Sequence, residues 1–516
     1  MKNEQRSSGS FRRTAELMSR WAGQASSLSI TSVVPFFHKL SVFLFLFSLC
    51  LSNLLAGEPN ELHEANSSAA TVSAKPNILF IFADDWGWGD LSCHGHPYVK
   101  TPNIDRLATE GTDFYRFTVA SGVCSPSRTA VMTGHFPARY NIDGHFAWVP
   151  SNAKRNMPDW LDTSAPTVSR FLQAAGYRTA HFGKWHLANN MIVDSPVPSE
   201  YGFDTYGAFN CAGEQMPVHE DADNAIEFIE QCHADEKPFF INLWVHEPHT
   251  PFHTVPKYRW RFRELEERDN IYASVLSHAD DRIGEVLDTL DRLELTENTL
   301  VIFSSDNGPA RGSGNQELKL THDTATGAGY GIAGAKGITG GRKGYKGSLM
   351  EGGIGVPFIA RWPGKIEAGK IDKRSIFSAV DLLPTFCEIA GALLPSSYQP
   401  DGISQLKTLR EGGSATREKP LFWKAASSRA ITSDRPHHWV AYAVAHDRWK
   451  LEVDKENSHI ELYDLIADPL ESTDLSESHP KIVADLQGKL EEWKSSLPPK
   501  PTGNVFSKER DSLEEK

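Results

Sequence analysis

The chain is poor in cysteine and has no excess of basic charge. It carries 6 cysteines in 516 residues and a formal net charge of -13. Six cysteines over this length are too few for a disulfide scaffold. The acidic balance argues against a nucleic-acid partner, because nucleic-acid binders usually present a basic surface. It does not exclude an anionic substrate, since the local field of a site can oppose the charge of the whole molecule.

The rest of the composition is that of an ordinary globular protein. Hydrophobic residues make up 40% and charged residues 23% of the chain, which suits soluble domains. The length allows roughly two to four domains. Composition therefore predicts a protein of enzyme size and says little more.

Residues 40–51, LSVFLFLFSLCL, form an apolar run near the N-terminus. A polar, basic leader precedes this run, and small residues follow it up to Ala56. This order is typical of a secretory signal peptide, and the run is too short for a transmembrane helix. We expect a signal-peptide region at 1–56 and a linker at 57–75. The protein would then be exported to a periplasmic, secreted or other extracytoplasmic compartment, without stable membrane insertion. An uncleaved anchor is the alternative.

Four cysteines lie outside both this run and the Cys124 motif described below. In an exported protein they could form bridges, or they could stay as free buried thiols. The sequence does not assign a pairing. They are Cys93, Cys211, Cys232 and Cys387.

Strands and helices alternate through most of the chain. Continuous apolar runs at 77–83, 238–245 and 299–303 are typical of strands buried on both faces. A long helix is predicted between Ile271 and Leu290, where apolar residues recur every three or four positions. The pattern predicts an α/β fold with a large, mostly parallel sheet sandwiched by helices.

A smaller C-terminal α+β domain is predicted after this main domain. Segments 438–444, 449–453 and 460–463 are typical of short antiparallel strands, and a helix is expected at about 480–495. We place the main domain at 76–405, the C-terminal subdomain at 406–500 and a charged tail, predicted to be disordered, at 501–516.

Charged and polar side chains follow the three buried strands above and a fourth, short strand predicted at 178–182. Carboxyl ends of parallel strands share one edge of an open sheet, where ligands bind. We therefore expect these segments to converge on one site, although each alone could be a turn, a helix cap or a structural histidine. They are Asp84 and Asp85, Lys184 and His186, His246, and Asp306 and Asn307.

The residue types in this set suit a particular chemistry. Three carboxylates and an amide oxygen are hard donors, which favour calcium or magnesium, whereas zinc would be expected to use His or Cys. A metal and several cations around one nucleophile describe attack on an anionic sulfate or phosphate ester. The cations and proton donors are Arg128, Lys184, His186, His246 and Lys346.

The nucleophile is predicted within residues 121–134, SGVCSPSRTAVMTG. Ser125 suits a helix N-cap, Pro126 the first helical position and Gly134 the exit. Unpaired amides and the helix dipole would therefore face Cys124, and Arg128 adds a cation in the same turn. A buried structural cysteine is the alternative.

The pattern C-x-P-S-R-x-x-x-x-T-G resembles the activation motif of Cys-type sulfatases of the alkaline-phosphatase superfamily. The resemblance spans roughly residues 76–470 and includes DDxGxGD from Asp84, GKWH from Gly183, VHEP from Val245, DNG from Asp306 and KGSLMEGG from Lys346. It implies an alkaline-phosphatase-like fold and hydrolysis of sulfate esters of carbohydrates or of arylsulfate-type substrates. The predicted export and the Gly-rich, lid-like segment 308–347 favour a sulfated carbohydrate over a small aryl sulfate as the substrate.

The resemblance also implies a cofactor and a maturation partner. In that family the motif cysteine is oxidised to Cα-formylglycine before folding, by a formylglycine-generating or an anaerobic sulfatase-maturing enzyme, and calcium is the usual metal. By position, the ligands of one calcium ion would be Asp84, Asp85, Asp306, Asn307 and the modified residue 124.

A role for each remaining group is implied in the same way. One hydroxyl of the hydrated aldehyde attacks sulfur to form a covalent sulfo-enzyme, and the second loses its proton to His186 and expels sulfate. Arg128 would stabilise the hydrate, and Lys184 and Lys346 would hold sulfate oxygens. His246 with Lys346 would help the departing alcohol oxygen acquire a proton.

Two other functions stay open. Related phosphonate monoester hydrolases or phosphodiesterases use the same cysteine motif, and a catalytically silent scaffold could bind sulfated glycans. Gly355 departs from the family pattern, because relatives often carry Arg there. Trp185, His249 and His253 are placed where they could meet the alcohol part of a substrate.

Overall fold

The structure, a computed structural model, describes residues 75–311, 320–323, 327–331, 337–413, 415–425 and 436–514, which lie within one unit, Ser73–Lys516. The predicted signal-peptide region, nearly all of the predicted linker and parts of the Gly-rich segment 308–347 fall outside the described residues. Within those ranges, every helix is too short or too polar to cross a membrane.

A mixed sheet of eight strands forms the centre of this unit. In order across the sheet, its strands are β11 (Lys370–Asp372), β2 (Thr112–Phe114), β10 (Phe358–Arg361), β7 (Thr299–Ser305), β1 (Asn77–Ala83), β6 (Phe239–Trp244), β4 (Arg178–Lys184) and β5 (Thr205–Phe209). The run from β7 to β5 is parallel throughout, whereas β10 is antiparallel to both β7 and β2. The prediction of a mostly parallel sheet is confirmed.

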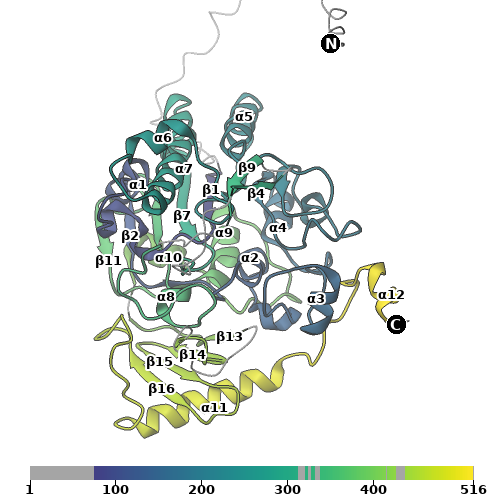
Figure 1. Cartoon of the computed structure of the whole chain (residues 1–516), viewed down its shortest axis with the longest axis vertical. Helices are drawn as coiled ribbons and strands as arrows, with labels where there is room; N and C mark the ends of the chain where they lie inside the picture. Colours follow the sequence, from purple (N-terminus) through teal and green to yellow (C-terminus); the bar gives the residue numbers. More distant parts are fainter. Residues whose placement is uncertain are drawn as a thin grey trace, which may run out of the picture. The chain divides into compact units, whose positions relative to one another are not determined.

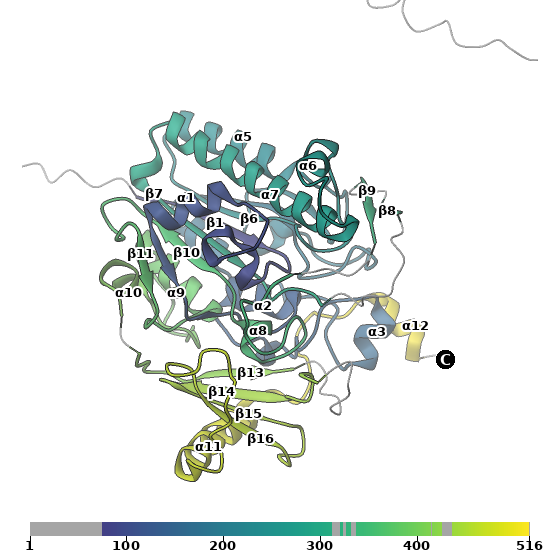
Figure 2. The ribbon, with the colours of Figure 1, turned by 60° about the vertical axis from the view of Figure 1, so that its left-hand side comes forward.

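Strand β1 shows why both faces of the sheet are covered. Its side chains alternate between two hydrophobic clusters, with Phe80 and Phe82 in one and Leu79 and Ile81 in the other, because successive strand residues point to opposite faces. Helices bury both faces (Figure 2). One face carries α1 (Pro102–Glu110), α5 (Asp221–Ala234) and α7 (Glu267–Arg292), and the other α2 (Cys124–Thr133), α4 (Val168–Ala174) and α9 (Leu382–Ala390).

A second, antiparallel sheet forms the C-terminal subdomain (Figure 1). Its strands, in order, are β13 (Leu421–Lys424), β14 (Tyr442–His446), β15 (Trp449–Val453) and β16 (Ile460–Asp464), and α11 (Pro480–Ser496) packs on it. The rings of Phe422 in β13 and Trp493 in α11 are stacked, with centroids 4.9 Å apart. The predicted strand at 449–453 is confirmed, the one at 438–444 begins only at Tyr442, and β13 was not predicted.

The remaining elements are short. The pair β3 (Phe117–Thr118) and β12 (Phe377–Ser378) is parallel, and β8 (Leu320–Asp323) and β9 (Gly327–Tyr330) are antiparallel. The other helices are α3 (Val149–Lys154), α6 (Pro256–Arg261), α8 (Glu351–Ile354), α10 (Leu406–Glu411) and α12 (Asp511–Glu514).

The charged tail is ordered through residue 514, and the prediction of disorder is wrong. Trp160 Nε1 donates to the carbonyl of Asn504 at 2.8 Å, and Arg510 Nε lies 2.7 Å from Asp159 Oδ2. Asp159 is fully buried, so the tail supplies the cation that a buried carboxylate needs. Composition of the tail alone cannot reveal this distant partner.

The four cysteines outside the motif are free thiols in the part of the chain that the structure describes. Cys93 is exposed, whereas Cys211, Cys232 and Cys387 are buried. Burial raises the pKa of Cys211 and of Cys232 to about 11, so these thiols stay protonated and unreactive at neutral pH.

Candidate active site

The four strand ends that were predicted to carry the site lie together. Strands β7, β1, β6 and β4 are adjacent and parallel, so the residues that follow them emerge at one edge of the sheet. Lys184, the last residue of β4, contacts Asp84 after β1, and the Asp85 amide donates to Asp306 Oδ1 after β7 at 3.4 Å. The predicted convergence is confirmed.

Buried oxygen atoms at this edge form a cluster suited to a hard cation. Asp84, Asp85 and Asp306 each offer a carboxylate oxygen, and these atoms lie within 4.8 Å of one another. Asn307 Nδ2 donates to Asp85 Oδ1 at 2.7 Å. Its own Oδ1 and Asp84 Oδ1 are buried and accept no hydrogen bond from the described residues. A calcium or magnesium ion would satisfy these oxygens, so the residues fit such an ion.

Each carboxylate of the cluster also has a cationic partner. Arg128 Nε and Nη2 donate to Asp306 Oδ2 at 2.9 and 2.7 Å, Lys184 Nζ donates to Asp84, and Lys346 Nζ lies 2.6 Å from Asp85 Oδ1. Arg128 is completely buried, which a guanidinium tolerates only when it is paired.

These ion pairs control the charge of the cluster. Burial would raise the pKa of Asp84, but His249, Lys184 and Arg128 hold it well below the ordinary value. Burial and the neighbouring Asp84 raise the pKa of Asp306. Burial would lower the pKa of Lys346, but Asp85 raises it above the ordinary value, so this ammonium stays protonated.

Helix α2 begins earlier than predicted. Its first residue is Cys124 and its N-cap is Val123, whereas Ser125 was expected to cap it. The Ser125 hydroxyl is engaged elsewhere, because its Oγ accepts from the Phe146 amide at 3.0 Å. The helix ends at Gly134 with φ 65°, as predicted. Cys124 therefore lies within the first turn and is only 3% exposed.

His186 faces Cys124 in a defined tautomer. Its Nδ1 lies 3.2 Å from Cys124 Sγ, and its Nε2 lies 2.9 Å from the carbonyl oxygen of Phe146. A carbonyl can only accept, so Nε2 carries the proton and the Nδ1 lone pair points at residue 124. Burial, followed by Lys184, lowers the pKa of His186 well below its ordinary value, which keeps the ring neutral.

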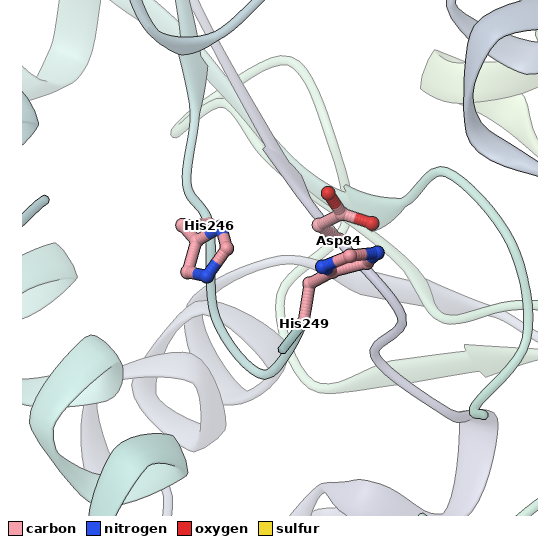
Figure 3. A group of neighbouring side chains, drawn as sticks. All are labelled: Asp84, His246 and His249. Atoms are coloured by element: carbon pink, nitrogen blue, oxygen red, sulfur yellow. The ribbon is translucent and has the colours of Figure 1, made fainter. Parts of the chain in front are cut away.

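His246 and His249, both on the segment that follows β6, lie near Asp84 (Figure 3). A ring nitrogen of each and a carboxylate oxygen of Asp84 lie within 4.8 Å of one another. His246 Nε2 is 3.1 Å from the carbonyl of Pro251, and burial lowers the pKa of His246 to about 4. The sequence interpretation placed His249 against substrate only. The position of His249 beside Asp84 could have been predicted from the spacing His246-x-x-His249 directly after a buried strand.

Of the two other residues assigned to substrate contact, Trp185 lies in the core and His253 lies beside His246. Trp185 is 0% exposed and packs against Tyr201 and Trp244 in the core, because it fills the space between these large rings. His253 is 4% exposed, with its ring 5.4 Å from that of His246. Trp185 therefore has no surface for a substrate.

The departure at Gly355 has a structural explanation. A Cβ atom at this position would lie 2.7 Å from Arg342 Nη1 and 2.9 Å from Glu351 Oε2. The Arg342 guanidinium lies over the ring of Trp88 at 4.4 Å. A side chain at 355 would collide with the guanidinium of Arg342. Arg342 thus places a guanidinium next to the position where relatives often carry Arg.

The sheet edge gathers hard-cation ligands, three paired cations and a helix-borne cysteine, an arrangement suited to the hydrolysis of anionic esters. The family model described as Sulfatase matches residues 76–392, and one described as N-sulphoglucosamine sulphohydrolase, C-terminal, matches residues 344–496. The chain belongs to the sulfatase family of the alkaline-phosphatase superfamily and is a sulfuric ester hydrolase.

Individual relatives cover most of the chain. It is 29% identical to the N-acetylgalactosamine-6-O-sulfatase of Bacteroides thetaiotaomicron, over 82% of this chain and 94% of that protein. It is 30% identical to the N-acetylgalactosamine-6-sulfatase of Canis lupus familiaris, over 73% and 74%. The structure of Ps i-CgsB in complex with k-i-k-neocarrahexaose matches with a TM-score of 0.68 and 26% identity, over 85% of this chain and 96% of that chain.

Proposed function

We propose that this chain hydrolyses sulfate esters of carbohydrates, using Cα-formylglycine at residue 124 and one calcium ion. The observation that carries the proposal is the position of Cys124 Sγ, 3.2 Å from the Nδ1 lone pair of a neutral His186. The names of the relatives support a sulfated sugar, and 6-sulfated N-acetylgalactosamine is the first substrate to test.

Two groups would add chemistry that the twenty amino acids lack. Calcium held by Asp84, Asp85, Asp306 and Asn307 would supply positive charge at the sulfate oxygens and at the attacking hydroxyl. Formylglycine as its hydrate would supply two hydroxyls on one carbon, one to attack sulfur and one to lose its proton when sulfate leaves.

The cations of the site would bind and orient the sulfate group. Lys184 and Lys346 lie at the edge of the cluster, and a sulfate ester would offer each of their amino groups an oxygen. Arg128 is locked on Asp306 and on the Lys184 carbonyl, 2.7 Å from its Nη1. The positive charge of Arg128 is therefore held in place before substrate binds. Such a preorganised charge stabilises negative charge that develops during the reaction.

Proton transfer would be divided between two sides of the site. His186 would accept a proton from residue 124 through Nδ1, while the Phe146 carbonyl holds the opposite nitrogen. On the leaving-group side, Lys346 would donate a hydrogen bond to the alcohol oxygen and His246 would help it acquire a proton.

Maturation and export complete the proposal. A formylglycine-generating or anaerobic sulfatase-maturing enzyme would act before folding, a sequence supported by the 3% exposure of Cys124. The signal-peptide region at 1–56 would direct export, and residues 76–405 and 406–500 would form the catalytic domain and the C-terminal subdomain.

Mass spectrometry of one tryptic peptide tests the nucleophile. Trypsin releases residues 117–128 between Arg116 and Arg128, and we expect this peptide from active, exported protein to carry an aldehyde in place of the thiol. Cys124→Ala is expected to abolish hydrolysis while the protein remains folded. Full activity of Cys124→Ala would refute the mechanism, and an unmodified cysteine throughout an active preparation would do the same.

A comparison of sulfate and phosphorus esters with the same aryl leaving group tests the reaction. We expect turnover of an aryl sulfate and none, or far less, of the matched aryl phosphodiester and phosphonate monoester. A clear preference for a phosphorus ester would replace the sulfatase activity by that alternative. Desulfation across defined sulfated mono- and oligosaccharides then identifies the sugar, and turnover of aryl sulfates with no desulfated sugar would contradict the carbohydrate substrate.

A further inference from the structure

A second cluster of metal-binding side chains lies beside the active site. It consists of His219, Glu247 and His278, whose ligand atoms lie within 4.8 Å of one another. His219 Nδ1 is 2.9 Å from Glu247 Oε1, and the centroids of the two imidazole rings are 4.3 Å apart. The proposed calcium ligands are not members of this group.

Three separate elements supply the cluster. His219 precedes α5, Glu247 follows β6 next to His246, and His278 lies in the middle of α7. His219 has φ 79°, a left-handed conformation that is uncommon for a residue other than glycine. Long-range packing and a strained backbone therefore bring these side chains together, rather than proximity in sequence.

The cluster contains a buried atom that lacks a partner. His278 is 8% exposed, and among the described residues its Nδ1 has no hydrogen-bond partner. Most buried polar atoms have one, so this nitrogen needs a partner that the structure does not contain, such as a water molecule or a metal ion. Glu247 is also buried, at 4% exposed, whereas the side chain of His219 keeps 26% exposure and leaves a path from solvent.

The charge around the cluster favours a cation. Asp221 adds a second buried carboxylate near Glu247. Arg282, the neighbouring guanidinium, pairs with Asp223 at 2.7 Å and with Glu285, so its charge is offset by carboxylates outside the cluster.

We propose that His219, Glu247 and His278 bind one divalent transition-metal ion of the zinc class. Two imidazole nitrogens and one carboxylate oxygen are a ligand set that zinc uses, with water in the fourth position. Calcium selects all-oxygen ligands and would be taken by the aspartate cluster instead. The ion would tie α7 and the turn before α5 to the residue next to His246, so its expected effect is to fix the His246–His249 segment.

Zinc binding is tested on the full-length protein after metal removal with a chelator. Calcium is restored in excess and zinc is then titrated by calorimetry, with elemental analysis of the product and a parallel cobalt titration. We expect one zinc ion per chain, a rise in melting temperature and a visible d–d spectrum with cobalt. The same result is expected for protein with an unmodified Cys124, so the outcome is independent of the sulfatase activity.

Matched variants locate the ion. His219→Ala and His278→Ala should lose the bound zinc and the cobalt spectrum. Asp306→Asn, in the aspartate cluster, and His233→Ala, an exposed histidine of α5, should keep both. If His278→Ala does not fold, His219→Ala decides, because His219 lies in a partly exposed turn. Absence of zinc binding beside calcium, or undiminished binding by His219→Ala, would overturn the proposal.

Discussion

A single backbone oxygen gives His186 its proposed function. The Phe146 carbonyl, 2.9 Å from Nε2, fixes the tautomer, and burial keeps the ring neutral so that Nδ1 can accept a proton. A carbonyl can belong to any residue type, so no motif could have pointed to this contact.

Replacing His186 tests that arrangement. We expect His186→Ala to lower kcat for an aryl sulfate by about 10²–10⁴-fold, the usual contribution of a positioned general base. Steady-state kinetics on preparations with equal formylglycine content provide the measurement. His459→Ala, at an exposed histidine just before β16, is the control. Near-normal kcat in the His186 variant would show that another group takes the proton.

Arg128 is expected to matter for stability as well as for charge. Arg128→Met leaves the buried Asp306 without its guanidinium, and breaking a buried pair in this way costs about 3–5 kcal/mol. Urea unfolding in the presence of a chelator measures the loss, and added calcium should recover part of it. Arg139→Met breaks a half-exposed pair with Asp401 and should cost about 1 kcal/mol or less. Equal losses in the two variants would contradict the buried pairing.

Among the elements, β15 of the C-terminal sheet contacts the segment that follows Lys346. Lys450 Nζ in β15 donates to the Leu349 carbonyl at 2.8 Å and to Glu471 Oε1 at 2.6 Å. It also lies 3.2 Å from Glu351 Oε1. This buried ammonium therefore holds the turn that follows Lys346.

Removal of that ammonium should loosen the turn. We expect Lys450→Met to destabilise the protein by about 3–5 kcal/mol, because Glu471 and Glu351 lose a buried partner. We also expect KM for sulfate esters to rise as Lys346 becomes less well placed. Lys489→Met, which breaks an exposed pair with Asp485 in α11, is the control. An unchanged KM in a folded Lys450→Met protein would show that Lys450 of β15 does not influence substrate binding.

The ordered tail provides another element to test. Truncation after Gly503 removes the contacts of Asn504 and Arg510 and leaves the buried Asp159 without its cation. We expect a loss of roughly 3–5 kcal/mol, the cost of removing one partner of a buried ion pair, measured by chemical unfolding. Lys500→Met, at an exposed position in the same segment, should have little effect, and an unchanged stability after truncation would mean that the tail contributes nothing.

Elements with a strong local signal could be predicted, and those defined by distant partners could not. The buried strands β1, β6 and β7 are continuous apolar runs, and because parallel strands end at a common edge, the charged residues after them could be assigned to one site. Strand β13 has only four residues and is defined by its pairing with β14. The N-cap of α2 was misassigned because Ser125 bonds a segment 21 residues away.

For the molecule as a whole, buried neutral histidines predict sensitivity to acid. Burial lowers the pKa of His181 to about 3 and that of His96 to about 4. Between pH 6.5 and these values the unfolded chain binds protons that the folded chain does not, so stability falls as pH falls. Each group contributes about 1.4 kcal/mol per pH unit within that window.

His181→Phe should remove part of that sensitivity. His181 is fully buried between Trp185 and Trp244, where an aromatic ring without a titrating group can replace it. The difference in unfolding free energy between pH 6.5 and pH 5 should shrink by roughly 2 kcal/mol. His233→Phe, at an exposed position, is the control and should leave the difference unchanged. If His181→Phe also leaves it unchanged, protonation of His181 does not contribute to the pH dependence of stability.

The order of the strands along the chain also determines how late in translation the central sheet can close. Strand β1 is completed on both sides only by β6 and β7, whose last residue is Ser305. At the pace of translation, Ser305 is added roughly 10–40 s after residue 124. Under the proposed maturation, oxidation of Cys124 would have to precede closure of the sheet, because residue 124 is only 3% exposed in the folded protein. A faster ribosome or a scarcer maturing enzyme would then yield equally stable molecules that are permanently inactive.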